Sequence, residues 1–189
     1  GVDFEPVAGT LTIPAGETAA TITVRILEDN VAEPQEMFTI ELSNASEAGL
    51  QVLNAIGTII DNDVAAISAS DSTFDEAGGS ITIPVTLTKP SATAVTVDYA
   101  FVDVSATSDS DYTGNLGTLT FSPGTTSLTI GVSIVDDIVS EGGETFRLVF
   151  TNPVGADLIA GSIVVTIVDD DVPTLSIADI AVSEDAGVA

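Results

Sequence analysis

The groups in this sequence that could do chemistry are clustered carboxylates. The stretch IVDDIVSEGGETF, residues 134–146, holds four of them within nine positions, and TIVDDD, residues 166–171, ends in three. Because the chain contains no His and no Cys, a site built on imidazole or thiolate ligands is excluded. Oxygen ligands alone suit hard divalent cations, and flexible carboxylate-rich loops suit calcium better than magnesium.

The charge balance raises the question of what neutralises these groups. The chain has 29 Asp and Glu against 3 Lys and Arg, for a net charge of −26. Two carboxylates 4 Å apart repel by about 1 kcal/mol in water and roughly 4 kcal/mol near a protein surface. Nine of them at one place would oppose folding on the scale of a domain's whole stability, about 5–15 kcal/mol. Either a cation binds them, or they stay apart as solvated surface charge.

A repeat organises the acidic stretches. GTLTIPAG begins at residue 9 and GTLTFSPG at residue 117, a shift of 108 residues. The same shift aligns EDNVAEPQEMF with DDIVSEGGETF and TIIDND with TIVDDD. Recurrence of the acidic patterns at one shift favours a metal site over plain surface charge. It also predicts the later part of one repeat at 1–63, a complete repeat at 64–171 and the start of a third at 172–189.

The elements that would position the acids are strands. ITIPVTL, residues 81–87, alternates apolar and polar side chains with a period of two. About seven such runs in roughly 108 residues predict an all-β fold of tandem immunoglobulin-like β-sandwiches. Pro84 suggests a strand edge or a bulge, and the Pro-Gly and Ala-Gly pairs at 123–124 and 15–16 suggest hairpin turns. We expect the acidic strand ends to gather at one pole of the sandwich.

Four motifs in order identify a resemblance. SDSDY (108–112), GTLTFSPG, VDDIVSEGGETF and TIVDDD together resemble the Calx-β domain, which occurs in sodium/calcium exchangers, in an integrin subunit tail and in tandem in bacterial surface proteins. The resemblance implies a β-sandwich that binds Ca²⁺ at one end, with Val139 contributing its backbone carbonyl. The side-chain ligands that it implies in the complete repeat are Glu76, Asp111, Asp136, Asp137, Glu141, Glu144, Asp169, Asp170 and Asp171.

The other two repeats carry fewer of these positions. In the first repeat Asn62 replaces the middle aspartate and Glu28 is longer than its counterpart Asp136, so we expect weaker or incomplete calcium binding there. In the third repeat only Glu184 is present, and we expect no site in residues 172–189 alone. The matching acids of the first repeat are Asp3, Glu28, Asp29, Glu33, Glu36, Asp61 and Asp63.

These observations predict a calcium-binding module of a large extracellular or cell-surface repeat protein, in a structural or adhesive role. DDDVP, residues 169–173, leaves almost no linker before the next repeat, so we expect calcium to stiffen this junction. The alternative is a calcium-sensing regulatory domain of a membrane protein similar to sodium/calcium exchangers. Calcium affinity distinguishes them, because sensors bind more tightly than extracellular modules.

Other functions are disfavoured by what the chain lacks. Nucleic-acid binding needs Lys and Arg at phosphates, and no apolar run is long enough to span a membrane. Glu141 and Glu144 could in principle hydrolyse a glycosidic bond. With no Trp and only two Tyr to hold a sugar, we expect no enzyme activity. The expected partners are calcium ions and neighbouring repeats, and the sequence identifies no protein or carbohydrate ligand.

Overall fold

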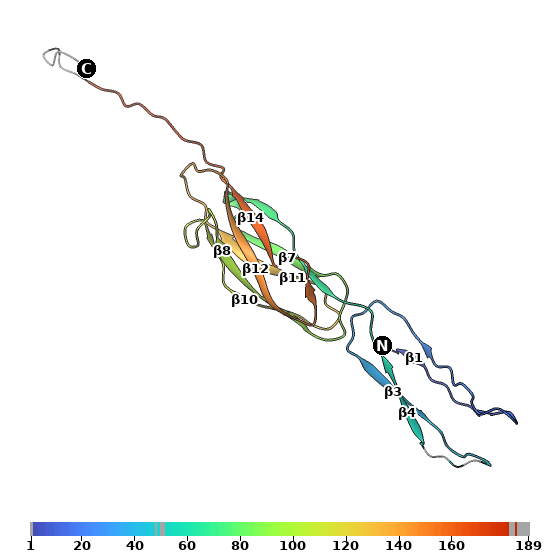
Figure 1. Cartoon of the computed structure of the whole chain (residues 1–189). Coiled ribbons are helices and arrows are strands. Elements are labelled where there is room, and N and C mark those ends of the chain that lie inside the picture. The colour runs from blue at the N-terminus through green and yellow to red at the C-terminus, as the bar shows by residue number, and fades with distance from the viewer. Residues whose placement is uncertain (1, 48, 50–51, 182–183, 185–189) are drawn as a thin grey trace.

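The chain forms an elongated arrangement with a β-sandwich at its centre (Figure 1). The structure, a computed structural model, describes all residues except 1, 48, 50–51, 182–183 and 185–189. The described residues between 2 and 63 extend from one end of the sandwich, and residues 172–181 leave from the opposite end as an extended segment (Figure 1). Among the described residues, no helix has the length and apolar character needed to cross a membrane.

Two five-stranded sheets build the sandwich and confirm the predicted all-β fold. The first sheet has the order β10 (Gly117–Phe121), β8 (Val95–Asp103), β12 (Glu144–Val154), β14 (Ser162–Val168) and β6 (Ser72–Asp75). The second has the order β13 (Asp157–Leu158), β5 (Ala66–Ser68), β7 (Ser80–Leu87), β11 (Ser127–Ile134) and β9 (Tyr112–Thr113). A short 3₁₀ helix, η1 (Glu76–Gly78), joins β6 to β7 across the two sheets.

The alternating pattern of the strands supplies the core. In β7 the residues Ile83, Val85 and Leu87 are buried while their neighbours along the strand are exposed, as period-two alternation requires. Phe146 of β12 is fully buried and stacks on Tyr112 of β9, with ring centroids 4.1 Å apart. This stack joins the two layers where β9 and β12 begin, beside the acidic loops.

Pro84 lies where one side of its strand has no neighbour. The residue is paired with Thr129 of β11 on one side. On the other side, β5 pairs with β7 only at Thr86 and Leu87. Although β7 is an inner strand of its sheet, it is locally an edge at Pro84, which agrees with the expectation for a residue that cannot donate a ladder hydrogen bond.

The turn at Pro123 and Gly124 is present, but the predicted hairpin is wrong. Gly124 has φ +77°, and Thr125 N–H donates to the Ser122 carbonyl at 2.9 Å. The strands on either side, β10 and β11, lie in different sheets and pair with β8 and β7. A hairpin within one sheet and a connection between two sheets both need a tight turn. The residues of the turn therefore do not indicate which sheet the next strand joins.

The first repeat reproduces part of this architecture in two strand pairs. Its strands are β1 (Phe4–Glu5) with β2 (Arg25–Ile26), and β3 (Glu36–Glu41) with β4 (Asn54–Ile59). Glu36 pairs with Ile59 as Glu144 pairs with Ile167, which is the same register after a shift of 108 residues. The stack of Phe4 on Phe38, with centroids 4.8 Å apart, likewise matches that of Tyr112 on Phe146.

The core predicts a large stability effect at Leu148, which is 0% exposed in the centre of β12. We expect Leu148→Ala to lower the free energy of unfolding by about 2–5 kcal/mol, because truncation removes buried surface and leaves a cavity. Urea unfolding of the metal-free chain measures this loss. Leu116→Ala is the control, since Leu116 is 82% exposed and should change stability by less than about 0.5 kcal/mol. Equal losses for the two variants would contradict the described core.

Candidate metal centre

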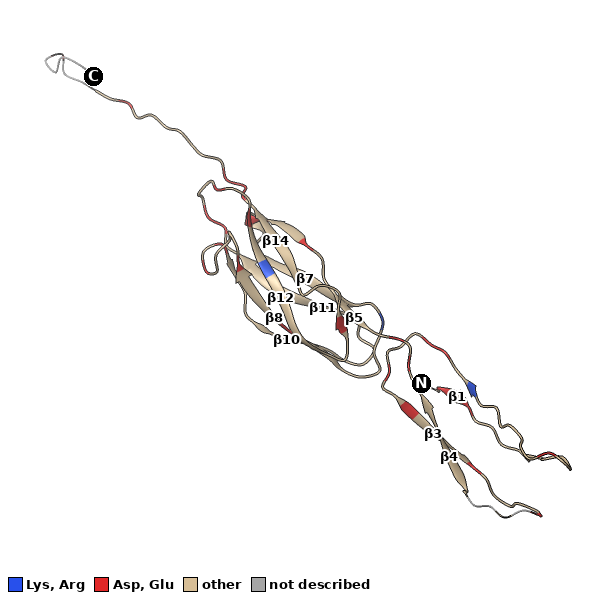
Figure 2. Ribbon diagram, viewed as in Figure 1, with Lys and Arg blue, Asp and Glu red and all other residues tan. Residues whose placement is uncertain are grey.

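The nine carboxylates predicted in the complete repeat all lie at one pole of the sandwich. Glu76 lies in η1 and Asp111 directly precedes β9. Four others lie in or at the end of the loop between β11 and β12, and the remaining three directly follow β14. Figure 2 shows acidic segments in these loops, at the end of the sandwich from which the C-terminal segment leaves. We call this set the second tip: Glu76, Asp111, Asp136, Asp137, Glu141, Glu144, Asp169, Asp170 and Asp171.

The side chains of the second tip are close enough to affect one another. Asp111, Glu141 and Glu144 each place a carboxylate oxygen within 4.8 Å of the other two. Electrostatic interactions link Glu76 to Asp137 and Asp169. They also link Asp171 to its two preceding aspartates and to Asp136 and Asp137. The structure therefore brings together all nine residues, which come from segments up to about a hundred residues apart in the sequence.

Burial and repulsion disfavour the ionised forms of several of these acids. Glu76 is only 7% exposed. Its burial, followed by the negative charges of Asp137, Asp169 and Glu141, raises the pKa of its carboxyl group to about 7. Burial and Asp111 raise the pKa of Glu144, and burial and neighbouring aspartates raise that of Asp171. The Oδ2 atom of Asp171 is also buried without a hydrogen-bond partner.

Backbone N–H groups hold the loops of the second tip in place. Asp169 accepts hydrogen bonds from the N–H of Glu141 at 2.8 Å and of Asp171 at 3.0 Å, so it ties the β11–β12 loop to the end of β14. Asp137 accepts one from the N–H of Val139 at 2.6 Å. These hydrogen bonds thus orient the carboxylates of Asp137 and Asp169, although the segments that carry them have no regular secondary structure.

The same three hydrogen bonds recur in the first repeat. Asp61 accepts hydrogen bonds from the N–H of Glu33 at 2.7 Å and from the N–H of Asp63 at 3.0 Å. Asp29 accepts one from the N–H of Val31 at 2.8 Å. The donation by Glu33 and Asp63 lowers the pKa of Asp61. We call the acids of this region the first tip, and one pocket is lined by all of them: Asp3, Glu28, Asp29, Glu33, Glu36, Asp61 and Asp63.

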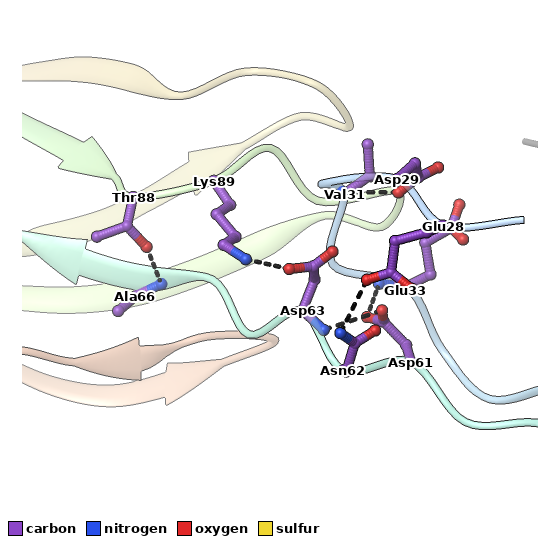
Figure 3. A network of polar contacts seen from close by, with 10 residues as sticks. All are labelled: Glu28, Asp29, Val31, Glu33, Asp61, Asn62, Asp63, Ala66, Thr88 and Lys89. Atoms are coloured by element: carbon purple, nitrogen blue, oxygen red, sulfur yellow. Dashed lines mark hydrogen bonds and ion pairs between the residues drawn. The ribbon is translucent and has the colours of Figure 1, made fainter.

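Two interactions make the first tip different from the second. Asn62 donates from its side-chain amide to Glu28 at 2.9 Å, whereas the corresponding pair in the second tip, Asp170 and Asp136, consists of two acids. Lys89 of the complete repeat forms an ion pair with Asp63 (Figure 3). Burial and Asp3 still raise the pKa of Glu33, so the first tip is only partly neutralised.

Sequence reasoning did not identify the residues that support Asp111. Thr107 donates to the Asp111 carboxylate from its backbone N–H at 2.7 Å and from its hydroxyl at 3.1 Å. The next residue, Tyr112, is buried and donates its hydroxyl to Asp103 at 2.5 Å. Burial and this bond raise the pKa of Tyr112. The only sequence signal was that Tyr112 follows Asp111 in the SDSDY motif. Lys89, also missed, lies outside every motif.

The donor set of the second tip fits a hard divalent cation. All nine side-chain donors are carboxylates, which are the ligands that calcium prefers. The buried Oδ2 atom of Asp171 lacks a hydrogen-bond partner, and burial together with neighbouring negative charges raises the pKa of Glu76 and of Asp171. A divalent cation would give this oxygen a partner and would place positive charge beside these carboxylates. The ligand role of each residue, including the carbonyl of Val139, remains a prediction.

The fold and the two tips define a class of protein, tandem β-sheet repeats with a carboxylate cluster at the end of each of the first two repeats. The family profile of the Calx-beta domain matches residues 1–63 and 60–171. The chain therefore belongs to the Calx-beta domain family, which confirms the resemblance noted from its motifs.

Curated relatives of the chain include extracellular and membrane proteins. It is 32% identical to Adhesion G-protein coupled receptor V1 of Danio rerio, over 92% of this chain and 3% of the receptor. It is 31% identical to Extracellular matrix protein 3 of Lytechinus variegatus, over 85% and 6%. It is 30% identical to Sodium/calcium exchanger 1 of Cavia porcellus, over 81% and 18%. The chain thus spans less than a fifth of the length of each of these three relatives.

Two solved structures resemble the complete sandwich. The Calx CBD1 domain in its apo form is 26% identical, with a TM-score of 0.54, and the match covers 58% of this chain and all of that domain. The calcium binding domain CBD12 of CALX1.1 is 27% identical, with a TM-score of 0.52, over 57% of this chain and 44% of the other.

The raised pKa of Glu76 predicts a pH-dependent stability in the presence of a chelator. The folded protein keeps this proton up to about pH 7, whereas the unfolded chain releases it near 4.5. The folded state then binds more protons, so the free energy of unfolding should fall as pH rises from about 4.5 to 7. Glu76→Gln should reduce this slope, measured by urea unfolding at several pH values.

The control for this prediction is Glu17→Gln, which removes a carboxylate from an exposed turn of the first repeat. Its pH profile should parallel that of the unchanged chain. If Glu76→Gln leaves the pH dependence of the unfolding free energy unchanged, as the control does, the described burial of Glu76 is contradicted.

Proposed function

We propose that the chain is a calcium-binding segment of a tandem-repeat protein, with its principal calcium site at the second tip. The observation that carries this proposal is the gathering of nine carboxylates at one pole of the sandwich. Among them Asp171, beside four other aspartates, has a buried oxygen with no hydrogen-bond partner. The similarity of the sandwich to CBD12 of CALX1.1, itself a calcium binding domain, supports the same function. We also propose that the segment is not catalytic.

The residues of the second tip would act by joining loops that otherwise repel. Asp111, Glu141 and Glu144 would hold calcium between the start of β9 and the start of β12. Asp169 and Asp171 would hold it between the end of β14 and the β11–β12 loop, to which Asp169 is already bonded. Calcium supplies the positive charge that these carboxylates lack, so its binding should order the loops and raise stability.

The placement of the second tip suggests a mechanical role. Asp171 directly precedes Val172 and Pro173, so its carboxylate lies where a following repeat begins. We propose boundaries of 1–63, 64–171 and 172–189 for the three repeats, supported by the equal registers of β3–β4 and β12–β14. Calcium at the second tip would then restrict the hinge between residue 171 and the next repeat.

For the parent protein we propose an extracellular or cell-surface location and a structural or adhesive role. The similarity to an adhesion receptor and to an extracellular matrix protein supports this proposal. A regulatory calcium sensor is the second candidate, favoured by the similarity to an exchanger. We expect a Kd of about 0.1–1 mM, as in extracellular modules. Calorimetric titration measures it, and a Kd near 1 μM would favour the sensor instead.

The ligand set is tested by replacing the three aspartates after β14 together. We expect Asp169→Ala, Asp170→Ala and Asp171→Ala in one chain to weaken calcium binding at the second tip at least about 100-fold, because the site loses three charged ligands. Isothermal titration calorimetry of the whole chain measures the change. The control removes three exposed acids elsewhere, with Glu17→Ala, Asp157→Ala and Asp179→Ala. Equal calcium binding by the two triple variants would refute the proposed site.

A further inference from the structure

The junction between the first two repeats contains one of the three Lys and Arg side chains of the sequence. Lys89 lies in the loop between β7 and β8 and points at the first tip, where its ammonium group pairs with Asp63 (Figure 3). The Asp63 side chain is 9% exposed and that of Lys89 is 33% exposed. An ion pair that is largely shielded from water is screened less by salt than a surface pair.

Backbone contacts hold the same loop against the first repeat. Ala32 N–H donates to the Pro90 carbonyl at 2.9 Å, and Ala92 N–H donates to the Ala32 carbonyl at 2.9 Å. Both polar groups of Ala32 are therefore used by the neighbouring repeat, and Ala32 and Ser91 are buried where they meet. Two reciprocal hydrogen bonds fix the position of the loop and so aim Lys89 at Asp63.

The loop is also hydrogen-bonded within its own repeat, so it connects the first repeat to the sandwich. Thr88 N–H donates to the Ala66 carbonyl at 2.9 Å, and Ala66 N–H donates to the Thr88 hydroxyl at 3.0 Å. Gly124 N–H donates to the Ser91 carbonyl at 2.9 Å. The contact thus connects the first repeat to the second sheet of the sandwich through β5 and β7.

The repeat shift provides an internal comparison. Asp63 corresponds to Asp171, and each donates its N–H to the aspartate two residues earlier at 3.0 Å. Asp63 has a lysine partner, whereas the Oδ2 atom of Asp171 is buried with no hydrogen-bond partner. Asp63 and Asp171 therefore occupy equivalent positions with the same backbone hydrogen bond. The Asp63 carboxylate is neutralised by a lysine, and the buried Asp171 oxygen has no partner.

We propose that Lys89 is a tethered counter-cation that takes the place of a metal ion at Asp63 and locks the first junction without calcium. We call the contacts of Lys89 and Ala32 across the first junction the lock, and this part of the proposal does not depend on calcium binding. The comparison with calcium at the second tip does depend on the proposed function. Junctions of this chain would then be of two kinds, one closed by a lysine and one closed by calcium.

The lock is tested by distance measurements on the whole chain in the presence of a chelator. The chain has no Cys, so Thr39→Cys and Thr120→Cys place one spin label on each side of the junction at exposed strand positions. We expect a narrow distance distribution by pulsed electron spin resonance. Lys89→Met should broaden it at least about twofold, and Lys89→Arg, which keeps the charge, should leave it narrow.

Arg147→Met is the matched control, because it removes the same charge from β12, where Arg147 donates to Ser162. It should leave the distribution unchanged. A distribution that is broad in chelator and narrows only with calcium would overturn the lock. So would an unchanged width in Lys89→Met.

The replacement of metal is tested separately in a chain whose second tip is disabled by the triple aspartate-to-alanine change. In that background we expect Lys89→Met to bind calcium at the first tip at least about tenfold more tightly than the chain with Lys89. Equal affinity would overturn the replacement. Failure of calcium binding at the intact second tip would instead refute the proposed function, and it would leave the distance measurement as the test of the lock.

Discussion

Repulsion among carboxylates at converging strand ends is the constraint on which the rest of this structure depends. The antiparallel sandwich brings loops from distant parts of a repeat to one pole, and here those loops carry nine acids. Among the described residues, the protein itself relieves part of this repulsion with hydrogen-bond donors and with one lysine. Backbone N–H groups bind Asp61 and Asp169, the Asn62 amide binds Glu28, and the Lys89 ammonium binds Asp63.

The hydrophobic core is what forces the acids together. The buried stack of Tyr112 on Phe146 joins β9 to β12 across the two layers. Asp111 precedes Tyr112 directly and Glu144 is the first residue of β12, so packing of the rings also brings these two carboxylates together. The free energy gained by burying apolar surface is large enough to hold these carboxylates near one another. A bound cation would then relieve their mutual repulsion.

The two tips show how small changes in sequence alter one design. Replacing an aspartate by Asn62 turns a repulsive neighbour of the acid at residue 28 into a hydrogen-bond donor. Adding Lys89 in the next repeat neutralises Asp63 from outside its own repeat. On the proposed function, such substitutions would give each junction of this chain its own dependence on calcium. The positive charge in the β7–β8 loop therefore acts on the preceding repeat and not on the repeat that contains it.

Sequence patterns were sufficient for the fold class and the family, because strand alternation and the order of the acidic motifs are local signals. The equal registers of β3–β4 and β12–β14 agree with the repeat shift, since similar segments pair alike. Contacts between distant segments were decided only in three dimensions. The turn at 123–124 has the residues of a hairpin, yet it joins two sheets, because β10 and β11 find different partners. The pairing of Lys89 with Asp63 and the burial of Asp171 Oδ2 likewise carry no short-range pattern, since each depends on how whole layers pack.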